Sequence, residues 1–143
     1  MAKIYRKTDR VKVQIKSGED TITLHLAPLS QHEKSEIQAL MMKSMATKDP
    51  ASATEGIRKS LQYSLKKVEG IEDSNGEPYN LEFNDGLIKQ ECIDDLMNMD
   101  IDLTSKVMLV CSNLIGGIPK EFKDDKGVKL PDIEILGDES GKK

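Results

Sequence analysis

The sequence has few of the residues that build catalytic or metal-binding sites. Its 143 residues include two histidines, two cysteines and no tryptophan. His25 and His32 have no cluster of cysteine or acidic ligands nearby, and neither has a recognisable orienting partner for general base catalysis. Cys92 and Cys111 lie in helical patterns without a CxxC spacing, which indicates buried, reduced thiols. We therefore expect a protein that is not an enzyme and has no catalytic residues, metal or cofactor.

Long apolar runs and aromatic residues are also scarce. No apolar run approaches the roughly 20 residues that cross a bilayer, and the N-terminus has no signal-peptide core, so we expect a cytoplasmic protein without a membrane partner. Aromatic residues make up 3% of the chain, whereas there are seven methionines. Methionine packs adaptably, either in an aromatic-poor core or at the surface that meets a partner.

Charge is unevenly distributed along the chain. The net charge of −4 argues against nucleic-acid binding. Residues 1–16 carry six basic residues against one acidic residue, a balance of +5, whereas residues 69–102 carry eleven acidic residues against one lysine, a balance of −10. Such asymmetry can steer association between unlike faces, including head-to-tail self-association. The simpler interpretation is a solvated surface.

The N-terminal part predicts a β-hairpin followed by a helix. Apolar and polar residues alternate over residues 10–16 and 20–27, the period of a half-buried strand, and the intervening Ser-Gly-Glu-Asp can close an antiparallel hairpin. Ser30 and Glu33 form a capping box, which predicts a helix over residues 31–46.

Apolar residues at helical spacing predict three more helices. The second covers residues 52–68, starts at a capping box formed by Ser52 and Glu55, and stops at Gly70. The third covers residues 87–99. The fourth is capped by Asp102 and ended by Gly116 and Gly117.

An acidic turn lies between the second and third of these helices. Its acidic residues partly match the spacing of a calcium loop, but Ile71 stands where the first acidic ligand should be. We therefore interpret this segment as a β-turn around Asn75 and Gly76 with short extended arms.

Together these patterns predict an α+β fold. We expect one mainly helical domain over residues 1–118, with about four helices, an N-terminal antiparallel hairpin and the small acidic turn. Residues 119–143 are predicted to form a charged, largely flexible tail, in which only residues 130–136 could dock as an extended piece and residues 137–143 are disordered.

Five methionines are the candidate partner-binding residues. They end the first and third predicted helices: Met41, Met42, Met45, Met97 and Met99. The simplest interpretation is that they fill an aromatic-poor core. A sharper hypothesis places Met42 and Met99, which fall off the main apolar stripes, in an exposed groove for a partner helix.

The order of these elements resembles that of the tail assembly chaperones of long-tailed bacteriophages. The resemblance covers roughly residues 10–118 and has no invariant catalytic motif. The segments that carry it are residues 26–30 (Leu-Ala-Pro-Leu-Ser), 65–71 (Leu-Lys-Lys-Val-Glu-Gly-Ile) and 75–79 (Asn-Gly-Glu-Pro-Tyr), followed by an acidic helix and a last helix.

The resemblance implies a non-enzymatic role in the host cell cytoplasm. Such chaperones bind the tape measure protein, recruit tail tube subunits, tend to self-associate and are absent from the mature virion. The alternatives are a structural virion component, such as a capsid decoration or head–tail joining protein, and a small regulatory protein that binds a host factor.

Overall fold

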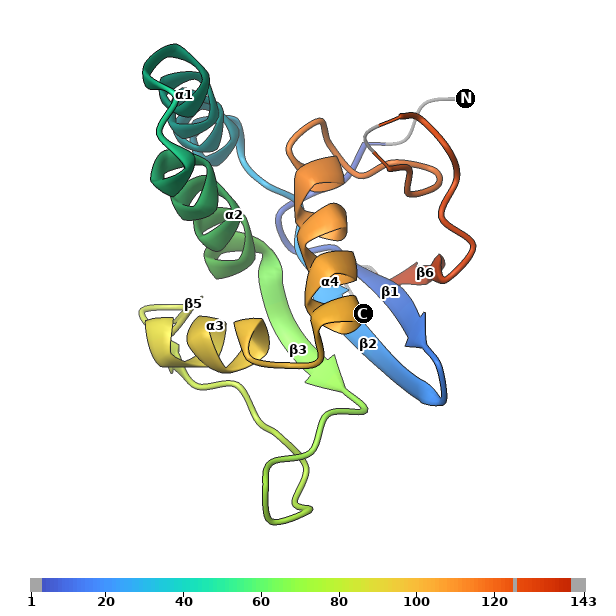
Figure 1. The fold of residues 1–143 in the computed structure, drawn as a ribbon. Coiled ribbons are helices and arrows are strands. Elements are labelled where there is room, and N and C mark those ends of the chain that lie inside the picture. Colours follow the sequence, from blue (N-terminus) through green and yellow to red (C-terminus); the bar gives the residue numbers. More distant parts are fainter. Residues whose placement is uncertain (1–3, 125, 140–143) are drawn as a thin grey trace.

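The computed structural model describes residues 4–124 and 126–139, with side chains described as far as residue 136. The fold is α+β, as the sequence predicted (Figure 1). Within the described residues it contains four helices, a four-stranded antiparallel sheet in the order β3-β2-β1-β6, and a short two-stranded ribbon, β4-β5.

The predicted N-terminal hairpin is confirmed. Strand β1 (Arg10–Ser17) pairs antiparallel with β2 (Asp20–Leu26), with Val13 opposite Leu24. The alternation observed in the sequence buries Val11, Val13 and Ile15 on one face of the sheet. Helix α4 (Ile101–Leu114) packs against β1, and α2 (Pro50–Ser64) packs against α4 (Figure 1). The core therefore lies between one sheet face and these helices.

Strand β3 (Leu65–Glu69) corrects the prediction that the second helix continues to Val68. The helix ends at Ser64, and β3 pairs with the otherwise open edge of β2. A register shift between His25 and Leu26 makes Lys66 the extra residue of a bulge. Leu65 and Val68 are therefore both buried although they are three positions apart. That spacing is typical of a helix, which explains the error.

Strand β6 (Ile133–Glu139) corrects the prediction of a largely flexible tail. It pairs antiparallel with β1, so the expected docking of residues 130–136 is confirmed in part. Phe122 and Ile133 are 1% and 2% exposed and belong to the core, so the domain does not end at residue 118. Residue 125 and residues 140–143 of the predicted tail lie outside the described residues.

The first capping box is confirmed, and the second is wrong. Glu33 N donates to Ser30 Oγ at 3.2 Å, and Ser30 N donates to Glu33 Oε1 at 2.8 Å, at the start of α1 (Gln31–Thr47). Helix α2 starts earlier than predicted, because Asp49 accepts a hydrogen bond from Ala51 N at 3.0 Å and Pro50 is the first helical residue. Proline at that position has no N–H to leave unsatisfied.

Helix α3 (Gln90–Met97) is shorter than predicted. The residues expected to begin it form β5 (Leu87–Ile88), which pairs with β4 (Phe83–Asn84). The two-residue turn between them has positive φ at Asp85 (54°) and Gly86 (81°). Asp-Gly between two short extended segments is a hairpin signal, and here it prevails over the helical spacing that predicted a helix from residue 87.

The remaining elements are present as predicted, with shifted boundaries. The acidic turn is a β-turn one residue earlier than predicted: Gly76 N donates to Asp73 O at 3.0 Å, so its central residues are Ser74 and Asn75 rather than Asn75 and Gly76. Helix α4 starts two positions earlier than expected, with Asp100 rather than Asp102 as its cap. No helix in the described part of the chain combines the length and apolar content needed to cross a membrane.

Candidate functional site

The five candidate methionines fall into two groups. On α1, Met42 and Met45 are 69% and 82% exposed, whereas Met41 is half-buried against the core. Met97 and Met99 are also half-buried and lie around the connection from α3 to α4. Met41, Met97 and Met99 therefore fill the edge of the core, as the simplest interpretation expects, although each keeps some exposed surface. Met42 and Met45 lie on the surface, as the sharper hypothesis expects for Met42.

The two groups do not meet in one groove. The C-terminal end of α1 lies at the free tip of the α1–α2 hairpin, while the α3–α4 connection lies beside the acidic turn (Figure 1). Among the described residues, no residue of α1 lines the hollows around Met99. The structure therefore separates Met42 from Met99, which were predicted to share a binding groove.

Helix α1 presents an apolar surface to solvent. It packs chiefly along α2, and Ile37 is its one fully buried residue. Between Gln38 and Thr47 the helix has a single charged side chain, that of Lys43. Four exposed apolar residues spaced for one side of the helix form what we call the α1 methionine stripe: Ala39, Met42, Met45 and Ala46.

Two adjoining hollows lie at the other end of the molecule, around the acidic turn. Their volumes are about 590 and 500 Å³, and both are lined by Ile71, Glu72 and Met99, so we treat them as one acidic groove. Apolar side chains from β2, the acidic turn and the two last helices form its floor: Ile22, Ile71, Tyr79, Leu96, Met99 and Leu103. Five carboxylates form its rim: Asp20, Glu72, Asp73, Asp95 and Asp100.

Local hydrogen bonds hold the acidic turn in place. The Oδ1 atom of Asp73 accepts from Asn75 N at 2.8 Å and from Glu77 N at 3.1 Å. The arms of the turn are joined by Tyr79 N, which donates to Ile71 O at 2.8 Å. The acidic turn is therefore held by hydrogen bonds among its own residues.

Tyr79 joins the turn to α3. Its hydroxyl donates to Asp95 Oδ2 at 2.7 Å. Burial and, next in size, this hydrogen bond raise the pKa of the Tyr79 phenol above its usual range. The phenol therefore stays protonated as a hydrogen-bond donor and keeps the carboxylate of Asp95 at the rim.

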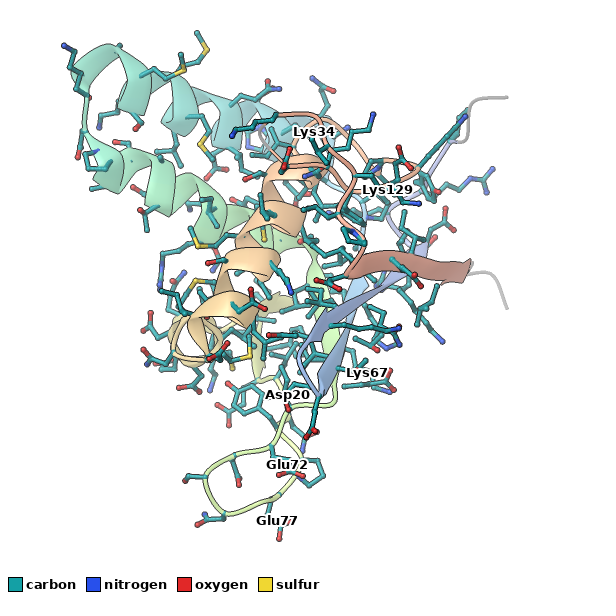
Figure 2. All side chains as sticks on the ribbon, turned by 45° about the vertical axis from the view of Figure 1, so that its right-hand side comes forward. Asp20, Lys34, Lys67, Glu72, Glu77 and Lys129 are labelled. Atoms are coloured by element: carbon teal, nitrogen blue, oxygen red, sulfur yellow. The ribbon has the colours of Figure 1, made fainter. Side chains whose placement is uncertain are left out.

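Asp20 and Glu72 are the least constrained rim carboxylates. Neither has a hydrogen-bond or ion-pair partner among the described residues. Figure 2 shows Asp20, at the end of the β1–β2 hairpin, close to Glu72 on the acidic turn, with Glu77 further along the turn. No lysine or arginine lines either hollow, so within the described part of the chain the rim charges face no cation.

The buried titratable groups in the described residues are two cysteines and His25, whose Nε2 lies 3.0 Å from Glu69 Oε2, so His25 has an orienting partner that the sequence did not predict. Cys92 and Cys111 are buried and free. Complete burial raises the pKa of the Cys111 thiol to about 12, which removes the thiolate that a nucleophile requires. Where side chains are described, His, Cys, Asp and Glu form no group of three that could hold a metal ion. The two surface features that the structure adds are the α1 methionine stripe and the acidic groove.

Sequence reasoning identified part of each surface. The sequence predicts the methionines of α1 as candidate binding residues and shows the acidic excess of residues 69–102. The groove itself was missed, because its floor combines β2, the turn and α4, which are far apart in the sequence. Comparison of the chain with protein-family models, with curated proteins and with solved structures gave no match.

Proposed function

We propose that this protein is a tail assembly chaperone of a long-tailed bacteriophage. In this role it binds the tape measure protein and recruits tail tube subunits in the host cell cytoplasm, and it leaves before the virion matures. The proposal rests on the resemblance in element order. The observation that carries it in the structure is the α1 methionine stripe, in which Met42 and Met45 are 69% and 82% exposed.

The stripe suits transient binding of an apolar helix. Helix α1 stands out with α2 as a hairpin, so a long partner helix can lie along it without meeting the sheet (Figure 1). Methionine is unbranched and polarizable, and it adapts to many apolar sequences. A chaperone that coats a long helical chain needs such tolerance, because successive segments of the partner differ.

Charged substitutions in the stripe test the proposal. In the double variant Met42→Asp/Met45→Asp, binding of the tape measure protein should weaken about 100-fold, because two methionines lose an apolar contact worth roughly 1.5 kcal/mol or more each. Both side chains are exposed, so the free energy of unfolding should change by less than about 0.5 kcal/mol. Co-expression with the tape measure protein, followed by size-exclusion chromatography, measures solubilisation and co-elution.

A matched control adds the same charges on another helix. Ser105→Asp/Ser112→Asp changes two exposed residues of α4 and should leave co-elution intact. If the tape measure protein stays insoluble with the unmodified protein, and the protein is found instead in purified mature particles, it is a structural virion component. Equal loss in both double variants would show that charge alone, rather than the stripe, disturbs binding.

A further inference from the structure

We propose that the acidic groove binds a cationic amphipathic segment of a partner protein. Apolar side chains of that segment would occupy the floor, and its lysine or arginine side chains would reach the rim. The proposal goes beyond the chaperone function, since it concerns a second surface of different chemistry at the other end of the molecule, and it holds for any partner that carries such a segment.

The floor of the groove is an incomplete apolar surface. Leu96 and Leu103 are buried beneath it, while Ile71, Tyr79 and Met99 are only half-buried. The two hollows, of about 590 and 500 Å³, have room for several side chains. Covering this surface would remove apolar area from water, and methionine at its centre tolerates differently shaped occupants.

The rim selects for positive charge. Three of its carboxylates accept hydrogen bonds within the protein: Asp73 from backbone N–H groups, Asp95 from the Tyr79 hydroxyl, and Asp100 from Asp102 N at 3.0 Å. These bonds position the charges without neutralising them. Asp20 and Glu72 have no such partner in the described part of the chain. A cation at this rim would therefore relieve repulsion among like charges as well as form ion pairs.

The groove distinguishes a peptide segment from simpler cations. A small cation would neutralise the rim and leave the floor exposed. A purely apolar helix would cover the floor and strip water from carboxylates that it cannot pair, which is unfavourable. A segment with both apolar and basic side chains can cover the floor and pair the rim carboxylates at the same time. The hydrogen-bonded turn holds the floor and the rim in a fixed arrangement.

Binding of synthetic peptides to the purified protein tests this assignment. The probe is a fluorescently labelled helix-forming peptide with leucines along one face and lysines beside them. Its anisotropy should report saturable binding that weakens as salt is raised. A matched peptide with glutamate in place of lysine should not bind, and one with alanine in place of leucine should bind at least about tenfold more weakly.

Variants of the protein locate the binding site. Asp20→Asn/Glu72→Gln removes the two unpaired rim charges and should weaken peptide binding about tenfold at low salt, as expected for the loss of two partly exposed ion pairs. The control Glu55→Gln/Glu91→Gln changes the net charge equally, at exposed residues of α2 and α3 away from the groove. It should change the affinity by no more than about twofold.

Three results would overturn the proposal. Equal weakening by both double variants would indicate attraction by net charge alone. Unchanged binding of the alanine-containing peptide would show that the floor is not used. If no peptide binds while the protein forms a salt-sensitive dimer that Asp20→Asn/Glu72→Gln abolishes, the occupant is a second copy of the chain. Because no tape measure protein is present, failure here is separate from failure of the chaperone proposal.

Discussion

Replacement of Phe122 by alanine is expected to lower the free energy of unfolding by about 3–5 kcal/mol. The side chain is 1% exposed and is among the largest fully buried ones. It lies in the C-terminal segment, where Leu130 N donates to Phe122 O at 2.9 Å and leads the chain towards β6. Because small domains are stable by only about 5–15 kcal/mol, the variant should be close to unfolding.

Urea denaturation followed by circular dichroism would measure this effect. Val128→Ala is the matched control, because Val128 belongs to the same segment and is 59% exposed. It should change the free energy of unfolding by less than about 0.5 kcal/mol. Similar small effects for both variants would show that the C-terminal segment is not part of the folded domain, as the sequence had suggested.

Replacement of Gly70 by alanine is the second substitution with a large expected effect. Gly70 ends β3 with φ of 84°, and a Cβ atom added there would lie 2.3 Å from Thr21 O. The left-handed conformation alone costs an alanine about 1 kcal/mol, and the overlap with the backbone of β2 forces β3 and β2 apart. We expect a total destabilisation of about 3 kcal/mol.

Gly76→Ala separates the two contributions. Gly76 has φ of 79°, but a Cβ atom there would meet nothing within 4 Å. The Gly76→Ala variant should therefore lose about 1 kcal/mol of unfolding free energy, because only the backbone conformation is unfavourable for alanine. Equal losses in the two variants, measured by thermal or urea unfolding, would show that the close approach at Gly70 is not a constraint. The Gly70 variant should also bind the cationic peptide more weakly, because the acidic turn follows this residue.

The regular local patterns were sufficient to predict much of the architecture. Alternating residues in β1 and β2, joined by a two-residue turn, specify a hairpin through contacts between close neighbours in the sequence. The capping box at Ser30 and Glu33 is equally local. Asp85 and Gly86 are an equally local signal, because this dipeptide favours the positive φ values of a two-residue hairpin turn, and the turn prevails over the helical spacing of the apolar residues that follow.

The two candidate sites were also predictable from the sequence only in part. Methionines at the end of α1 could be identified from the sequence, but their exposure could not. Met41 turns towards α2, whereas Met42 and Met45 do not, and that depends on which side of α1 meets its neighbour. The acidic composition of residues 69–102 was evident, yet a groove exists only where β2 and α4 supply its floor.

What the sequence determined by itself was the set of elements whose hydrogen bonds close within a few residues: the hairpin, the capped start of α1 and the acidic turn. Tertiary structure alone decided the rest. Residues 65–69 have the apolar spacing of a helix, but the open edge of β2 offers backbone partners, and the bulge at Lys66 lets Leu65 and Val68 both reach the core. Similarly, the charged segment around β6 becomes ordered because β1 has a second edge to pair and the core has room for Phe122. Unpaired backbone groups and unfilled core volume are properties of the assembled molecule, and no window of sequence contains them.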